Sequence, residues 1–186
     1  GLYAFSDERI KNNFENPDNS FLLQKIEDIN LQKYEYIDKL TNGSGKIHGF
    51  KAQDIKNEIE NSVTLSTGVI PNYFEMCEVV DKKIKVKDNH DLVVGDKIRI
   101  YDDSMKETKI TNIEDNLLTV EEDIDGNEVF LYGKEVDDFH SLNWDVINGV
   151  HIGATKEIIR RLKNYEQENA VLKSQYNDLL SRIVAL

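Results

Sequence analysis

Ser6 and Lys11 stand five positions apart in the stretch AFSDERIKNN, near the start of the 186-residue chain. A serine hydroxyl is a weak nucleophile until a base takes its proton, and a lysine amine can be that base where burial lowers its pKa. On a regular helix, five residues turn through about 500°, so the two side chains would point apart. They can meet where Ser6 lies in an extended segment and Lys11 curls back from the first turn. The pair is a candidate nucleophile and general base.

The same residues also suit a helix start that carries no chemistry. Ser6 can accept hydrogen bonds from the free amides of a first helical turn, and the acidic Asp7 and Glu8 suit the positive end of the helix dipole. The turn sequence NPDNS, residues 16–20, would then end or interrupt that helix. Residue types and spacing alone leave both interpretations open.

Composition excludes several classes of protein. With 39% hydrophobic and 31% charged residues, an ordered chain of one ordinary domain or two small ones is expected. The net charge of -12 argues against nucleic acid and anionic membranes as partners, and no apolar run is long enough for a membrane span. Cys77 is the single cysteine, and the four histidines lack ligand spacing, so neither a metal site nor a cofactor is expected: His48, His90, His140 and His151.

The first third of the chain alternates between helix and strand signals. Helical spacing of Leu22, Leu23, Ile26 and Ile29 is followed by KYEYI, whose alternation predicts a strand. A turn at Asn42-Gly43 leads to a returning strand over residues 47–50. Ala52, Ile55 and Ile59 then share one face of a further helix.

From Glu78 to about Gly133 the chain consists of short alternating runs separated by Asn, Asp and Gly turns. Runs such as KKIKVKD and VVGDKIRIYDD predict a small antiparallel barrel or sandwich. This β-rich block stands between two parts of a helical framework. Its role is open between an arm that grips a partner, which we favour, and a passive insertion.

The chain ends in a long helix, expected from about residue 144, with no proline, and no glycine after Gly153. Its apolar residues repeat with 4-3 spacing over about four heptads, which is typical of a coiled coil. Two bulky tyrosines in the repeat favour a trimer over a tight dimer. The predicted seam comprises Ile158, Leu162, Tyr165, Asn169, Leu172, Tyr176, Leu179, Ile183 and Leu186.

Charges beside the seam predict a parallel arrangement of identical helices. Arg161 on one chain would face Glu166 on the next, and Glu168 would face Lys173. Asn169 within the seam would fix the register. The alternative is a single amphipathic helix packed on its own domain.

Three segments in order, SDERIKNNF, GFKAQD and the stretch from SLNWD onward, resemble the C-terminal intramolecular chaperone domain of phage tail spikes, tail fibres and endosialidases. The resemblance covers roughly residues 6–76 and 133–186. It implies a domain that drives an upstream fibre to trimerise and then releases itself by cutting its own chain.

Carried to this sequence, the resemblance implies a single-turnover serine autoprotease. The scissile bond would be Phe5-Ser6, with Ser6 as nucleophile and Lys11 as general base. A hydroxyl that attacks the preceding carbonyl gives an ester, which water then hydrolyses. Asp7 and Arg9 match the motif and would hold its geometry.

The second motif supplies four more matches and one departure. Gly49 would permit a close backbone approach and Phe50 would be a core residue, while Ala52 and Gln53 complete the match. Asp54 stands where the family usually has Glu, so any role at that position is not carried over.

The sequence therefore predicts an α+β chain: a helical framework with a short hairpin, a β-rich insertion and a long C-terminal helix that forms a parallel trimeric coiled coil. Residues 1–5 would end the upstream fibre, 6–78 and 133–186 would form the chaperone domain, and 79–132 the insertion. The expected partners are two further copies and the upstream part of the same polypeptide. By the resemblance, the domain would act in the host cytoplasm during virion assembly, and the mature fibre would stay on the virion. The alternative is a trimeric structural cap that is never cut, with a binding or packing β insertion.

Overall fold

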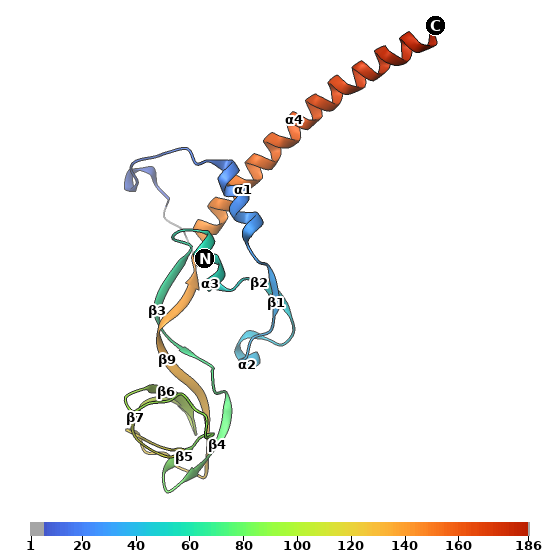
Figure 1. The fold of residues 1–186 in the computed structure, drawn as a ribbon. Helices are drawn as coiled ribbons and strands as arrows, with labels where there is room; N and C mark the ends of the chain where they lie inside the picture. Colours follow the sequence, from blue (N-terminus) through green and yellow to red (C-terminus); the bar gives the residue numbers. More distant parts are fainter. Residues whose placement is uncertain (1–5, 186) are drawn as a thin grey trace. The chain divides into compact units, whose positions relative to one another are not determined.

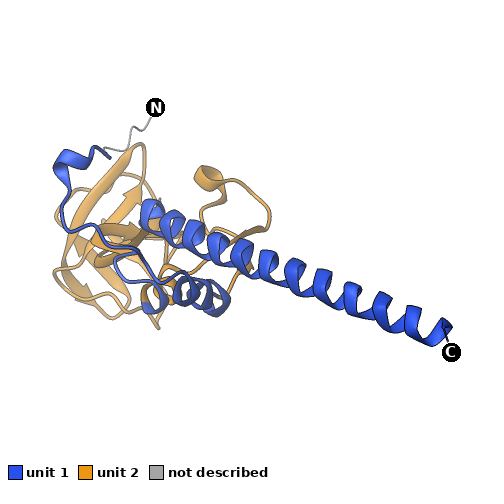
Figure 2. Ribbon diagram, turned by 90° about the horizontal axis from the view of Figure 1, so that it is seen from above, with its two compact units in different colours: residues 1–29, 57–62, 143–186 blue, residues 30–56, 63–142 orange. Residues whose placement is uncertain are grey.

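A computed structural model describes residues 6–185 of the chain. The chain forms two compact units, shown in separate colours in Figure 2. Unit 1 comprises residues 1–29, 57–62 and 143–186, and unit 2 comprises residues 30–56 and 63–142. Each unit is described by itself.

Unit 1 contains one short turn of 3-10 helix and two α-helices (Figure 1): η1 (Glu8–Ile10), α1 (Asn19–Asp28) and α4 (Trp144–Val184). Asp18 caps α1 by accepting from the amides of Ser20 and Phe21, and Asn143 caps α4 through the amide of Val146. Both helices therefore begin directly after an N-cap residue of a preferred type, Asp or Asn, whose own backbone is extended. None of the helices in residues 6–185 is long and apolar enough to cross a membrane.

Packing of α1 against the start of α4 depends on a glycine and a buried carboxylate. A Cβ at Gly153 would lie 2.3 Å from Leu22 Cδ1, so any larger residue there would force the Leu22 side chain to move. The buried Glu157 carboxylate accepts hydrogen bonds from Ser20 Oγ at 3.0 Å, Arg160 Nη2 at 2.7 Å and Arg161 Nε at 2.8 Å. The two arginines hold the pKa of Glu157 far below its ordinary value. These contacts fasten α1 to the first turns of α4.

Unit 2 begins with a small hairpin arm. Strands β1 (Gln32–Tyr34) and β2 (Ile47–Gly49) pair antiparallel, and the loop between them carries the single-turn helix α2 (Lys39–Asn42). Asp38 caps α2 through the amides of Leu40 and Thr41, and its other carboxylate oxygen accepts from Tyr132 Oη at 3.2 Å. Helix α3 (Ala52–Glu58) follows and buries Ile55.

Six strands of the described chain close into a barrel, visible around β4 to β9 in Figure 1. The ring runs β9, β4, β5, β8, β7, β6 and back to β9, with antiparallel pairing throughout. Closure leaves no unpaired edge in the ring, which small β domains otherwise have to protect. The strands are β4 (Glu75–Val80), β5 (Lys83–Lys85), β6 (Lys97–Tyr101), β7 (Met105–Glu114), β8 (Leu117–Val120) and β9 (Glu128–Leu142).

Alternation of apolar and polar residues explains the barrel's interior, because every second side chain of a strand faces inward. Ile98 and Ile100 on β6 and Val129 and Leu131 on β9 are almost wholly buried, and the residues between them are less buried. The core cluster comprises Cys77, Ile84, Val86, Leu92, Ile98, Ile100, Ile110, Leu118, Val120, Ile124, Val129 and Leu131.

Strand β9 continues beyond the barrel and pairs with β3 (Val63–Ile70) from Lys134 to Leu142. Gly133 stands where the strand leaves the ring, and a Cβ there would lie only 1.8 Å from the Ile70 carbonyl oxygen. The boundary predicted between residues 132 and 133 therefore falls inside one continuous strand.

The α+β class, the hairpin, the small β block and the long helix are confirmed, and the choice between barrel and sandwich is settled as a barrel. The helix expected directly after Ser6 is wrong: only Glu8–Ile10 turn, and residues 11–18 form neither helix nor strand. Ile10 and Phe14 remain 67% and 71% exposed, so no apolar face is buried that would stabilise a longer helix.

Candidate functional site

The side chains of Ser6 and Lys11 meet. Lys11 Nζ donates a hydrogen bond to Ser6 Oγ at 2.7 Å. The tight η1 turn brings the chain back after Asp7, and the Lys11 amide donates to the Glu8 carbonyl at 3.0 Å before the backbone becomes extended. The five-residue separation, which would part these side chains on an α-helix, is closed by this turn.

Asp7 and Arg9 hold the turn between them. The Asp7 carboxylate accepts from the Arg9 amide at 2.9 Å, from Nε at 2.9 Å and from Nη2 at 2.6 Å. The Arg9 guanidinium lowers the pKa of Asp7, because it stabilises the charged carboxylate. Asp7, rather than Ser6, therefore caps the turn, and the Ser6 hydroxyl is left for Lys11.

In this arrangement the hydroxyl and the amine are both exposed in a single chain. An ammonium group has donors but no lone pair, so it can take the serine proton only after losing one of its own. Phe5 lies outside the described residues.

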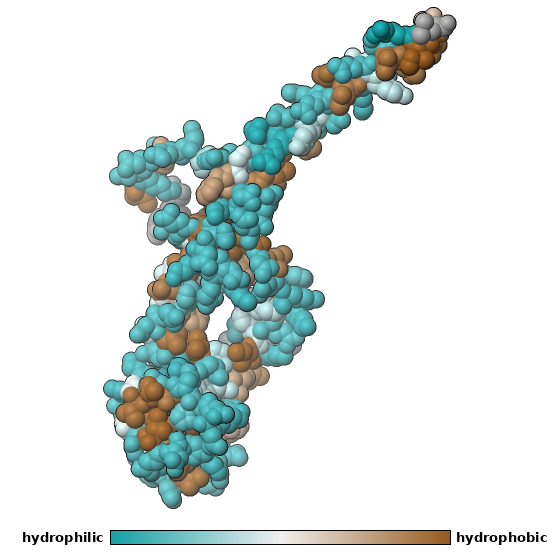
Figure 3. All heavy atoms as spheres, in the orientation of Figure 1, coloured by the Kyte–Doolittle hydropathy of each residue, from teal (hydrophilic) through white to brown (hydrophobic). Residues whose placement is uncertain are grey.

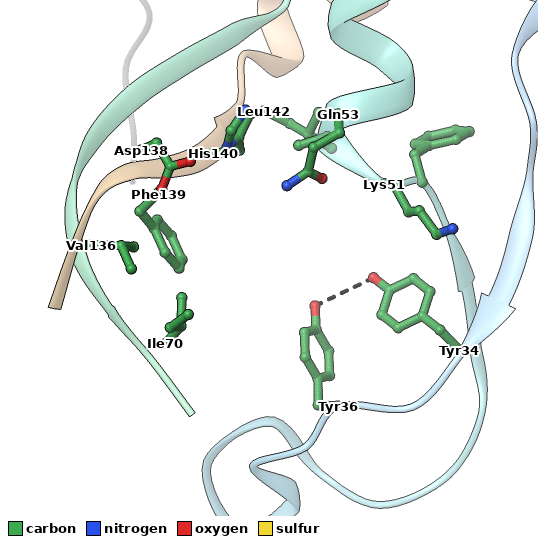
Figure 4. A pocket seen from close by; sticks show the side chains of 12 residues that line it. Tyr34, Tyr36, Lys51, Gln53, Ile70, Val136, Asp138, Phe139, His140 and Leu142 are labelled. Atoms are coloured by element: carbon green, nitrogen blue, oxygen red, sulfur yellow. Dashed lines mark hydrogen bonds between the residues drawn. The ribbon is translucent and has the colours of Figure 1, made fainter. Parts of the chain in front are cut away.

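Residues of the second motif gather beside the hairpin arm. A Cβ on Gly49 would lie 2.9 Å from Tyr34 Cε1, so the glycine lets the tyrosine ring lie directly over β2. Phe50 is half-buried rather than part of the barrel core. Phe50, Ala52 and Gln53 instead line a cavity of about 540 Å³ within unit 2, and Figure 4 shows the Gln53 carboxamide directed into it.

We call this space the tyrosine cavity. The phenol oxygens of Tyr34 and Tyr36 lie 3.5 Å apart on the side of the arm, and this contact raises the pKa of Tyr34. The opposite side is formed by β3 and β9. The full lining is Tyr34, Tyr36, Phe50, Lys51, Ala52, Gln53, Ile70, Val136, Asp138, Phe139, His140 and Leu142.

Sequence reasoning missed most of this lining. The sequence assigned His140 no site, and the structure places it in the lining of the cavity. The alternation in KYEYI, which sets Tyr34 and Tyr36 on the same side, was the available signal. Asp138 and Phe139 had none, because a bulge in the β3–β9 pairing between Ser66 and Gly68 breaks the two-residue repeat there. Within residues 6–185, no group of three His, Cys, Asp or Glu side chains is arranged to hold a metal ion.

The predicted seam of α4 is uncovered in the single chain. Its described apolar members are between 52% and 64% exposed, and brown side chains recur along α4 in Figure 3. Arg161, expected to pair with Glu166 of a partner, binds Glu157 of its own chain. Leu186, the last seam residue, lies outside the described part. The seam members with measured exposure are Ile158, Leu162, Tyr165, Leu172, Tyr176, Leu179 and Ile183.

Comparison with known families gives a match over residues 6–64, to the sequence profile described as the chaperone of endosialidase. We call residues 6–64 the chaperone segment, after the description of the profile that they match. The predicted resemblance is confirmed, and this chaperone segment contains Ser6, Lys11 and the whole second motif. The description of the matched profile suggests a chaperone role, and its name, Peptidase_S74, suggests a serine peptidase.

A viral protein is similar to almost the whole chain. It is "Uncharacterized protein VP1" of Micromonas pusilla reovirus (isolate Netherlands/2005), 28% identical over 235 aligned residues. The alignment covers 96% of this chain but 12% of that protein, so the chain spans about an eighth of its relative's length. The likeness extends through the barrel and α4, beyond the chaperone segment.

Proposed function

We propose that this chain is the intramolecular chaperone of a viral fibre or spike: it trimerises the upstream part of its own polypeptide and then releases itself by cutting the Phe5-Ser6 bond. The observation that carries this proposal is the 2.7 Å hydrogen bond between Lys11 Nζ and Ser6 Oγ, inside the chaperone segment. The fibre would assemble in the host cytoplasm and remain on the virion after release.

The proposed reaction is an acyl shift followed by hydrolysis. Lys11, as a free amine, takes the proton of Ser6 Oγ while that oxygen attacks the Phe5 carbonyl carbon. The bond from that carbon to the Ser6 nitrogen breaks, and the proton passes to the nitrogen, which becomes an α-amine. Water then hydrolyses the ester, giving a Phe5 carboxylate and restoring the Ser6 hydroxyl. The substrate bond belongs to the chain, so each chain reacts once.

Trimerisation is supported by the uncovered seam of α4. Seven apolar side chains repeat along one stripe and stay more than half exposed, which a stable helix in water corrects by association. In the trimer, Arg161 would exchange its own Glu157 for Glu166 of the neighbour, while Arg160 keeps Glu157 paired.

The barrel, in this proposal, is an insertion that grips the fibre. It has its own closed ring and its own core, and no seam residue belongs to that core. The chaperone domain would then comprise 6–78 and 133–186, as the sequence predicts.

A second function is favoured by the exposure of the pair. Ser6 and Lys11 are both exposed in the single chain, so no part of that chain shields the pair from water. A trimeric cap that is never cut, with the barrel as its binding or packing part, would have the same fold.

Purified chains distinguish the two functions. Wild type should lose residues 1–5 together with anything fused before them, whereas Ser6→Ala and Lys11→Arg should stay intact as trimers, measured by gel and light scattering. Lys11→Arg keeps the charge but is a poor base. Ser44→Ala and Lys46→Arg, in the exposed arm loop, are the matched controls and should be cut as wild type. Cleavage that survives Ser6→Ala contradicts the proposed chemistry.

A further inference from the structure

The tyrosine cavity has the dimensions and chemistry of a binding site, yet nothing described in unit 2 fills it. Its volume of about 540 Å³ lies in the range of ligand pockets. Four lining residues have polar side-chain groups that make no hydrogen bond or ion pair with any other side chain or backbone group of residues 6–185. They are Lys51, Gln53, Asp138 and His140.

Charge and shape indicate what could enter. Lys51 and Asp138 balance one another, so the cavity favours an uncharged occupant. Four aromatic side chains provide large apolar faces, from Tyr34, Tyr36, Phe50 and Phe139. The carboxamide of Gln53 can both donate and accept, which suits the N–H and C=O groups of an extended backbone. The cavity thus suits an uncharged peptide with aromatic or aliphatic side chains.

The chain itself contains such a peptide next to the candidate cleavage bond. Leu2, Tyr3, Ala4 and Phe5 carry no charge, and three of the four are large and apolar. Charged residues begin immediately afterwards, at Asp7. The site around Ser6 is also incomplete in one chain, because its nucleophile and base are both exposed. A partner surface is therefore needed to exclude water from this pair.

We propose that the tyrosine cavity of one copy binds the Leu2–Phe5 segment of a neighbouring copy and thereby holds the Phe5-Ser6 bond for attack. The inference rests on the proposed function and adds the pocket that recognises the substrate. Binding in a neighbour makes cleavage conditional on assembly, so an unassembled fibre is not released.

Photo-crosslinking in the full chain tests the contact without needing cleavage. Phe5→p-benzoylphenylalanine is placed in the Ser6→Ala background, and two forms of different mass are mixed before irradiation. We expect adducts between copies that map to residues 50–53 or 136–142. Adducts elsewhere, adducts within one copy only, or no adduct overturn the proposal. Phe14→p-benzoylphenylalanine, at an exposed aromatic position of the described chain, is the control and should give no adduct with these residues.

Two neighbouring aspartates give a matched test in the cleavable chain. Asp138→Arg puts a second positive charge among the lining residues and should slow release at least about tenfold. Asp137→Arg makes the same charge change outside the lining and should stay within about twofold of wild type. Equal rates for the two variants overturn the proposal while leaving the cleavage itself standing. A wild-type chain that is never cut refutes the proposed function. The crosslink would then still show whether the tyrosine cavity binds the Leu2–Phe5 segment.

Discussion

The barrel buries its apolar residues within one chain, whereas the long helix α4 leaves most of its apolar residues exposed. The barrel closes its hydrogen-bonded ring, and its twelve core residues are at most 8% exposed. The seam of α4 leaves seven apolar side chains more than half exposed. The barrel core is complete in one chain, whereas the distal part of α4 leaves its apolar seam without packing partners there. The proposed trimer would supply those partners.

A charge in the seam should have the largest effect. Leu172→Asp places a carboxylate at the three-fold contact of the proposed trimer and should abolish assembly, because three like charges would be buried together. Light scattering should then report single chains. The barrel should keep its thermal transition, since its core cluster contains no residue of α4.

Ser174→Asp adds the same charge outside the seam and is the matched control, which should remain trimeric. A Leu172→Asp chain that still assembles would mean that α4 is not the trimer contact.

A cavity in the barrel core should destabilise the barrel and leave the assembly of α4 unchanged. Leu118→Ala empties a fully buried site and should lower the free energy of unfolding of the barrel by about 2–5 kcal/mol. Urea titration monitored by circular dichroism measures this loss. Assembly through α4 should persist under native conditions. Dissociation into single chains while the barrel is still folded would show that the barrel and the α4 seam do not form independently of one another.

Loosening the η1 turn should affect rate rather than assembly. Asp7→Asn weakens the charged contact with Arg9, so the turn that brings Lys11 to Ser6 becomes less ordered. We expect a cleavage rate about tenfold lower in the trimer, since small misplacements of reacting groups cost this much or more. Asp18→Asn changes another capping aspartate, at α1, and should leave the rate nearly unchanged, measured by the appearance of the released chain. Equal cleavage rates for the two variants would show that Asp7 does not position Lys11 for the reaction.

Acid should give the smallest effect, at the proximal end of α4. The folded pKa of Glu157 lies below its ordinary value of 4.5, so its charge stabilises the α1–α4 contact above that pH and the contribution is lost as pH falls below it. Hydrogen exchange of the α1 amides should accelerate between about pH 4.5 and pH 3 relative to the barrel. In Glu157→Gln this pH-dependent difference should disappear. A variant whose α1 keeps the wild-type pH profile would show that other carboxylates are responsible.

Patterns that repeat were readable from the sequence. The 4-3 spacing from Ile158 to Ile183 predicted a long helix, and α4 runs from Trp144 to Val184. Strand-length runs separated by Gly and Asn predicted a small β block, and the structure closes it into a barrel. In both cases many residues repeat the same hydrophobic pattern, so one residue that departs from it does not change the predicted element.

Features that depend on one residue or on distant contacts were not readable. The helix expected after Ser6 failed because Asp7 caps a single turn and no packing surface supports Ile10 or Phe14. The tyrosine cavity joins a hairpin to a strand about one hundred residues later, and a bulge sets the direction of the Asp138 region. The pairing of Ser6 with Lys11 was foreseen as one of two options, and the hydrogen bond between them now makes its chemistry testable.

The most direct test of the account is to trap the ester. Wild-type trimer is folded in hydroxylamine, which attacks esters far faster than amides, and both fragments are weighed by intact mass spectrometry. The account predicts an upstream fragment that ends in a Phe5 hydroxamate and a released chain that begins with the free amine of Ser6. An uncut chain, a cut at another bond, or the same products from Ser6→Ala would contradict it.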